Sequence, residues 1–206
     1  MKNLKMKSQN EYIGDDKFIK MLEHYNCPTP LSIIKMRFAG AVCSPNLELR
    51  PTDVISSLWP EGKEPRLETK DEAELFFKFF MGLWDEVFAT VKQNKVRLGR
   101  LKSDSRESLK KLCLLRYDEI ETGYVEGFWG GKENLKLPAY IAEIVDSLSD
   151  LAGVYISIAQ KMAGAEKSED VSAAVAHTDR MVEKAIDFII ENSVLPRIEE
   201  LKRTVN

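Results

Sequence analysis

The run ETGYVEGFWGG, residues 121–131, contains two glycines four positions apart, Gly123 and Gly127. In a helix this spacing places both glycines on one face, where the missing side chains let another helix approach closely. Two arrangements fit such a strip: packing against a phenylalanine-rich helix of the same chain, or contact with a second copy of the chain. The doublet Gly130–Gly131 predicts the end of this helix.

Hydrophobic residues at helical spacing continue on both sides of this run, and no segment alternates convincingly with a period of two, so we predict an all-α protein. The expected helices run from Asp15 to near Pro28, from Pro30 to before Pro45, from Pro51 to Pro60, over 70–94, from Ser105 to Gly130, from Pro138 to Met162, and from Ser168 to a bend or stop at Pro196. We expect a multi-helix, orthogonal or bundle-like domain over residues 1–136, and a C-terminal helical hairpin over residues 137–206 packed on the same core.

The segment 70–94 is predicted to form the hydrophobic centre of the fold. Thr69-Lys-Asp-Glu72 has the spacing of a capping box, in which the threonine side chain and the glutamate side chain satisfy free amides at the start of a helix. Phenylalanine and tryptophan residues such as Phe76, Phe80 and Trp84 then recur at helical spacing. Gly82 in their midst predicts a close crossing with another element.

Composition limits the class of protein. Hydrophobic residues make up 44% of the 206 residues and charged residues 31%, the balance of a globular protein. No apolar run approaches the ~18 residues that a membrane-spanning helix needs. Cys27, Cys43 and Cys113 are an odd number without a Cys-x-x-Cys pair, and the basic N-terminus lacks the apolar core of a secretory signal. We therefore expect a cytoplasmic protein without a membrane partner.

We find no set of residues arranged for catalysis, for cofactor binding or for metal binding. His24 and His177 are the two histidines, and neither belongs to the Glu-x-x-His pattern of di-iron bundles. Cys27 lies three residues from His24, which suggests either a thiolate couple or, as we prefer, a structural cysteine at a helix break. Gly130-Gly131-Lys132 lacks the remaining residues of a phosphate-binding loop.

An acidic group near the glycine strip has two interpretations, a divalent-cation site or a solvated helix surface. Its members are Asp118, Glu119, Glu121 and Glu126.

Residues 92–116 form a basic segment, with nine Lys and Arg against two acidic residues, in a chain of formal net charge −3. Such polarity favours an anionic partner, including nucleic acid, or an acidic face of another copy. A solvated loop is the competing interpretation, because aromatic residues are not interleaved with the basic ones before Tyr117. The anion-binding candidates are Arg97, Arg100, Lys102, Lys110 and Lys111.

Several motifs together resemble a known family. Residues 39–62 contain a small-residue helix, two prolines around a short loop, and a helix ending in Leu58-Trp59, and Gly123-Tyr-Val-Glu-Gly127 follows further along the chain. This pattern resembles the YecA/YgfB-like family of uncharacterised bacterial proteins, and it covers roughly residues 12–130. The resemblance implies an all-helical, self-associating domain without an established reaction. The chain departs from the family pattern at Ile120, where the family has tryptophan, and it lacks the cysteine-rich zinc-binding tail of many members.

These observations lead to a prediction of function. We expect a non-catalytic helical adaptor or regulatory protein that acts through contacts with a protein partner whose identity the sequence does not give, with a homodimer as one form of contact. Phe128 and Trp129 are predicted to lie at the surface and to anchor a partner, because large aromatics beside a glycine break often do so. The interaction candidates are Gly123, Tyr124, Gly127, Phe128 and Trp129. Anion or nucleic-acid binding by the basic segment is the alternative.

Overall fold

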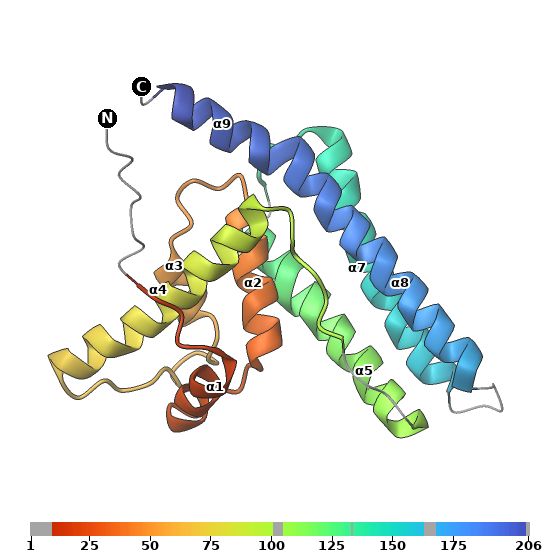
Figure 1. The fold of residues 1–206 in the computed structure, drawn as a ribbon, viewed down its shortest axis with the longest axis horizontal. Helices are drawn as coiled ribbons and strands as arrows, with labels where there is room; N and C mark the ends of the chain where they lie inside the picture. The colour runs from red at the N-terminus through yellow and green to blue at the C-terminus, as the bar shows by residue number, and fades with distance from the viewer. Residues whose placement is uncertain (1–9, 101–104, 133, 163–167, 205–206) are drawn as a thin grey trace.

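A computed structural model describes residues 10–100, 105–132, 134–162 and 168–204 (Figure 1). These residues form helices and connecting loops without any β-strand, so the predicted all-α class is confirmed. The elements are α1 (Asp15–His24), α2 (Leu31–Cys43), α3 (Pro51–Ser56), α4 (Lys70–Lys92), α5 (Arg106–Asp118), the π-helical turn η1 (Glu119–Val125), α6 (Glu126–Trp129), α7 (Ala139–Lys161), α8 (Ser168–Ile189), the π-helical turn η2 (Ile190–Val194) and α9 (Leu195–Thr204). In this part of the chain, no helix has the length and apolar character needed to cross a membrane.

Helix α2 lies at the centre of the fold. Helices α1 and α4 pack on one side of it, and the continuous rod α5–η1–α6 packs on the other (Figure 1). Helices α7 and α8 form the predicted antiparallel hairpin, which lies against α5 and η1. Helix α2 is therefore apolar around most of its circumference, as a helix buried on several sides must be.

The aromatic residues of α4 form the predicted hydrophobic centre. The Phe80 ring meets the Phe18 ring edge-on with 5.1 Å between centroids, and it lies 4.9 Å from the Phe76 ring. Trp59 packs against both Phe76 and Phe80. The capping residue Thr69 accepts a hydrogen bond from the Glu72 amide, at 3.1 Å. The Glu72 carboxylate reaches back one residue further than predicted, to the amide of Glu68.

The glycine strip allows the predicted close approach, but its partner is α2 and not the phenylalanine-rich helix α4. A Cβ atom on Gly127 would lie 2.2 Å from the Arg37 carbonyl oxygen, and a Cβ on Gly40 would lie 2.0 Å from the Tyr124 carbonyl oxygen. Glycines on both helices thus meet the backbone of the other helix. Gly82 of α4 also marks a close contact, although it meets the extended residues Glu11 and Tyr12 and not another helix.

A buried arginine binds the π-helical turn η1. The Glu126 amide points to the carbonyls of Glu121, five residues back, and Gly123, so the Thr122 carbonyl can accept from another donor. That donor is Arg37 of α2, whose Nε lies 2.9 Å from the Thr122 oxygen. Pro196 is the second residue of α9, directly after the π-helical turn η2. The predicted stop is wrong there, because the chain continues as helix from α8 through η2 into α9, whereas the axis changes direction between α8 and α9 in Figure 1.

Candidate functional site

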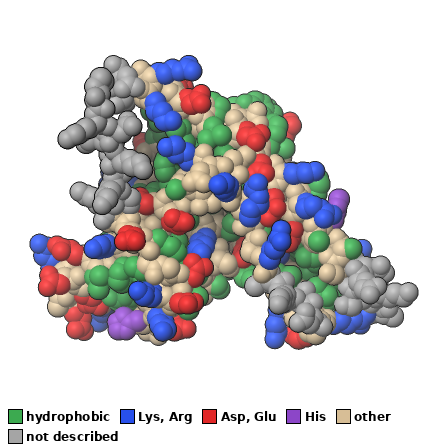
Figure 2. Space-filling view, viewed as in Figure 1, with side chains coloured by type: hydrophobic (Ala, Val, Ile, Leu, Met, Phe, Trp, Pro, Cys, Tyr) green, Lys and Arg blue, Asp and Glu red, His purple; other side chains and the backbone are tan. Residues whose placement is uncertain are grey.

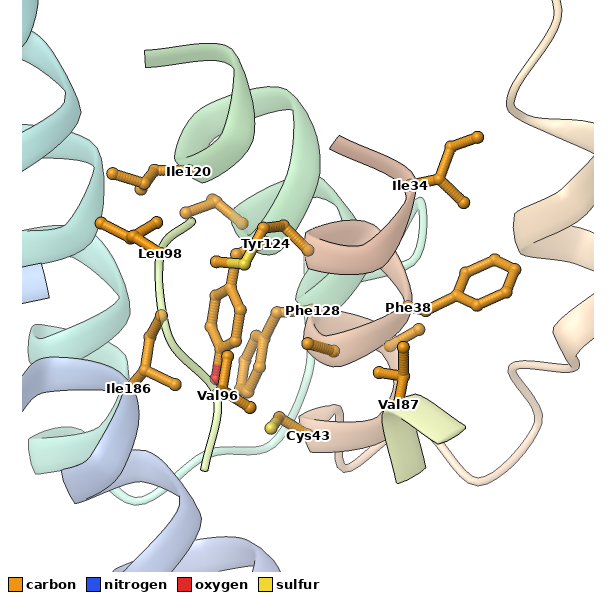
Figure 3. Packing of buried hydrophobic residues seen from close by; sticks show 14 of the residues in the cluster. Ile34, Phe38, Cys43, Val87, Val96, Leu98, Ile120, Tyr124, Phe128 and Ile186 are labelled. Atoms are coloured by element: carbon orange, nitrogen blue, oxygen red, sulfur yellow. The ribbon is translucent and has the colours of Figure 1, made fainter. Parts of the chain in front are cut away.

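The structure corrects the predicted surface position of Phe128. Gly123, Tyr124, Gly127 and Phe128 are buried within the chain, and Phe128 is 0% exposed. The Phe128 side chain lies beside Tyr124 and near Cys43 of α2 (Figure 3), because the face of α6 that carries Gly127 is pressed against that helix. Trp129 is half-buried and, together with Gly127, borders a groove.

The basic segment is divided by ion pairs. Arg97 pairs with Asp187 of α8 at 2.7 Å, and Arg116 is buried in a network of its own. Arg100, Lys110 and Lys111 are exposed, with Lys111 3.7 Å from Glu107, whereas Lys102 lies outside the described residues. Basic and acidic side chains are interspersed over the face in Figure 2, so this face carries no large field of one sign.

Arg116 forms a buried polar network that joins three helices. Its guanidinium pairs with Glu119 of η1 and with Asp179 of α8, and it donates a hydrogen bond to the Gly99 carbonyl. The Tyr155 hydroxyl of α7 donates to Asp179 at 2.6 Å. Burial lowers the pKa of Arg116, but the carboxylates of Glu119 and Asp179 outweigh burial and raise it. The network is closed on itself, so we interpret it as structural.

The acidic group near the glycine strip points in different directions. Glu119 faces Arg116, Glu126 pairs with Arg37 at 2.7 Å, and burial raises the pKa of Asp118. Glu121 borders a groove on another side. Across the described ranges, no group of three or more His, Cys, Asp or Glu side chains is placed to hold a metal ion.

Cys27 has the environment of a structural thiol. It is half-buried and donates weakly to the carbonyls of Thr29 and Leu58, at 3.8 and 3.9 Å. Burial raises the pKa of its thiol, which disfavours the reactive thiolate. His24 and His177 are both exposed.

An apolar groove of about 630 Å³ opens where α2 ends, between α4 and α9. We call it the apolar groove, and its hydrophobic lining is Ala41, Val42, Leu47, Leu49, Trp84, Phe88, Val194, Ile198 and Leu201. Several of these side chains face solvent, since Leu47 is 81% exposed, Leu201 53% and Phe88 40%. Single exposed apolar residues are ordinary, but several around one hollow are typical of a binding surface.

Two basic side chains complete the apolar groove. Lys202 borders it, and Arg197 donates to the carbonyls of Val42 and Cys43 at the end of α2, at 3.5 and 3.3 Å. Burial lowers the pKa of Arg197. Because its acceptors are neutral carbonyls, these bonds orient the guanidinium without cancelling its charge.

A second groove, of about 820 Å³, lies beside α6 and its glycine turn, and Leu49 lines both grooves. We call it the charged groove, and its lining includes Arg37, Asp53, Glu121, Glu126, Trp129, Lys132 and Ser149. Helices α2 and α3, η1, α6 with its glycine turn, and α7 all contribute to it. Both Gly130 and Gly131 adopt positive φ angles, so the predicted helix end is where the chain turns into this groove.

Sequence reasoning did not find either groove. The signal for the apolar groove was weak: Leu47 and Leu49 lie in a loop between two prolines, where no helical pattern explains them. Comparisons with protein-family models, with curated proteins and with solved structures found no match.

Proposed function

We propose that this protein is a non-catalytic helical adaptor or regulator whose apolar groove binds an amphipathic helix of a protein partner. The observation that carries the proposal is the set of exposed apolar side chains, Leu47, Phe88 and Leu201, around one hollow. The resemblance to the YecA/YgfB-like family agrees with such a role, since it implies a helical domain that acts by association.

The groove favours a helix with a mixed surface. A helix in a groove presents apolar residues at positions i, i+3 or i+4, and i+7, and these would cover Leu47, Phe88 and Ile198. Arg197 at the same groove, which bonds only neutral carbonyls among the described residues, favours an acidic residue beside that apolar stripe. We therefore expect a partner segment that is apolar on one face and acidic at its edge.

Site-specific photo-crosslinking tests the proposal. A benzoylphenylalanine at position 47 should capture the partner in cells, whereas the same group at Met181, which is 42% exposed on α8, should not. The captured segment, prepared as a peptide, should bind the purified protein. Phe88→Glu should weaken that binding by about 30-fold, because a central apolar contact contributes about 2 kcal/mol.

Phe77→Glu is the matched control. Phe77 lies on the same helix and is 39% exposed, close to the 40% of Phe88, but it does not line the groove. Equal loss of binding in both variants, or crosslinks that do not depend on Phe88, would contradict the proposal. Crosslinks from position 47 to a second copy of this chain would assign the groove to a homodimer instead.

Anion or nucleic-acid binding by residues 92–116 is the alternative, with less support. Arg97 and Arg116 are engaged by carboxylates, so the binding would depend on exposed residues such as Arg100, Lys110 and Lys111. Binding to a random-sequence oligonucleotide that falls steeply with salt, and that is lost when Lys110 and Lys111 become alanine, would favour this alternative.

A further inference from the structure

The charged groove has an unbalanced carboxylate. We propose that it binds an alkylammonium or alkylguanidinium group, with Glu121 as the counter-ion and the Trp129 indole as an apolar wall. Glu121 and Trp129 do not line the apolar groove, so either assignment can fail without the other.

The other charged side chains of the groove already have partners. Arg37 pairs with Glu126 at 2.7 Å and donates to the Ser57 carbonyl at 3.0 Å, and Lys132 pairs with Glu48. The Asp53 carboxylate accepts from the Arg50 amide at 2.9 Å, at the start of α3. An anionic ligand would therefore have to break an existing ion pair, which argues against that class of ligand.

Glu121 differs from these residues. Its Oε2 atom is buried and has no hydrogen-bond partner among the described residues. A carboxylate oxygen shielded from water without a donor is unfavourable, and a donor with positive charge relieves this cost best. Glu121 also lies in the π-helical turn η1, and such turns occur frequently at functional sites. The Glu121 side chain is half-buried and lines the groove, so its carboxylate is within the site where a ligand would lie.

Trp129 provides the second recognition element. It lines the same groove, and the buried Phe128 ring meets it edge-on at 5.8 Å, which fixes the indole. A cation over an indole face is attracted by the ring, and this attraction strengthens when the cation is partly desolvated. The lining of the groove also has more negative than positive side chains. It contains three carboxylates, from Asp53, Glu121 and Glu126, and two cationic groups, from Arg37 and Lys132, so the groove as a whole favours a positively charged ligand.

Calorimetric titration with butylammonium and butylguanidinium tests the proposal, with butanol as the neutral probe. We expect a dissociation constant on the order of 1 mM for at least one cation, since few atoms contribute, and no measurable binding of butanol. Glu121→Gln should weaken cation binding by at least tenfold, and Trp129→Leu by about threefold to tenfold. Glu143→Gln, which removes an exposed charge of α7 outside the groove, should change it by less than twofold.

A second arm distinguishes a free amine from a basic side chain of a protein. The capped tripeptides Gly-Lys-Gly and Gly-Arg-Gly should bind more tightly than butylammonium and butylguanidinium if the groove receives a side chain, and no more tightly than these free cations if it receives a small molecule. Gly-norleucine-Gly is the uncharged control and should not bind in either case. Circular dichroism confirms that each variant is folded. Two results would overturn the proposal. One is that neither cation binds at a concentration about 10-fold above the expected dissociation constant. The other is that the Glu121→Gln and Glu143→Gln variants bind the cations with equal affinity.

Discussion

Gly40 occupies the point where α2 meets η1 and α6 without space for a side chain. A Cβ there would lie 2.0 Å from the Tyr124 carbonyl oxygen and 2.8 Å from the Phe128 amide nitrogen, so the helices would have to separate. We predict that Gly40→Ala lowers the free energy of unfolding by about 2–3 kcal/mol, because overpacked backbone has no flexible atom that can yield. Urea denaturation followed by tryptophan fluorescence measures this change.

Gly153 in the middle of α7 supplies the opposite case. It is exposed, and a Cβ atom there would meet nothing within 4 Å. Gly153→Ala should raise the free energy of unfolding by about 0.5–1 kcal/mol, since alanine favours the helix over glycine. If Gly40→Ala and Gly153→Ala changed the free energy of unfolding in the same direction, the close approach of α2 to the glycine strip would not explain why position 40 requires glycine.

At the scale of elements, the Arg116 network joins helices that are distant in sequence. Arg116 of α5 is 1% exposed, and its charge is balanced by Glu119 and Asp179. Arg116→Met would leave the buried Glu119 carboxylate without its partner, so we predict a loss of about 3–5 kcal/mol in the free energy of unfolding. Thermal and urea unfolding of the purified variant measure this loss.

A double-mutant cycle tests whether the unpaired Glu119 carboxylate causes the loss of stability in Arg116→Met. Adding Glu119→Gln to Arg116→Met removes the stranded charge and should recover at least about 1 kcal/mol of the loss. Arg100→Met, an exposed change in the same basic segment, should stay within about 0.5 kcal/mol of the unchanged protein. Simple additivity in the cycle would mean that the two side chains do not act as a pair.

These elements also show how far the sequence could predict the structure. Caps, prolines and helical spacing are local, so most helices and the glycine turn at Gly130 were predictable. The packing partner of Gly123 and Gly127 was not, because spacing identifies a bare helix face but not the helix that covers it. Phe128 was misplaced for the same reason. The apolar groove joins Leu47, Phe88 and Leu201, residues far apart in sequence, and so depends on tertiary arrangement.

At the scale of the whole molecule, one hydrophobic core includes both predicted parts of the chain. It contains Phe38 and Phe80 from the first part together with Val145, Leu148 and Val182 from the hairpin. A shared core predicts that the parts unfold together, because separating them would expose apolar side chains of both to water.

The three tryptophans make this prediction measurable. Trp59, Trp84 and Trp129 all precede residue 137, so fluorescence reports the first part of the chain, and no tryptophan emission comes from α7 or α8 themselves. Val145→Ala in α7, which removes fully buried methyl groups, should lower the stability measured by fluorescence by about 2 kcal/mol. Hydrogen exchange of the α7 and α8 amides should give the same loss. If exchange in the hairpin became faster while the fluorescence midpoint did not move, residues 137–206 would form a separate cooperative unit, and the contacts of α7 with α5 and η1 would be too weak to couple them.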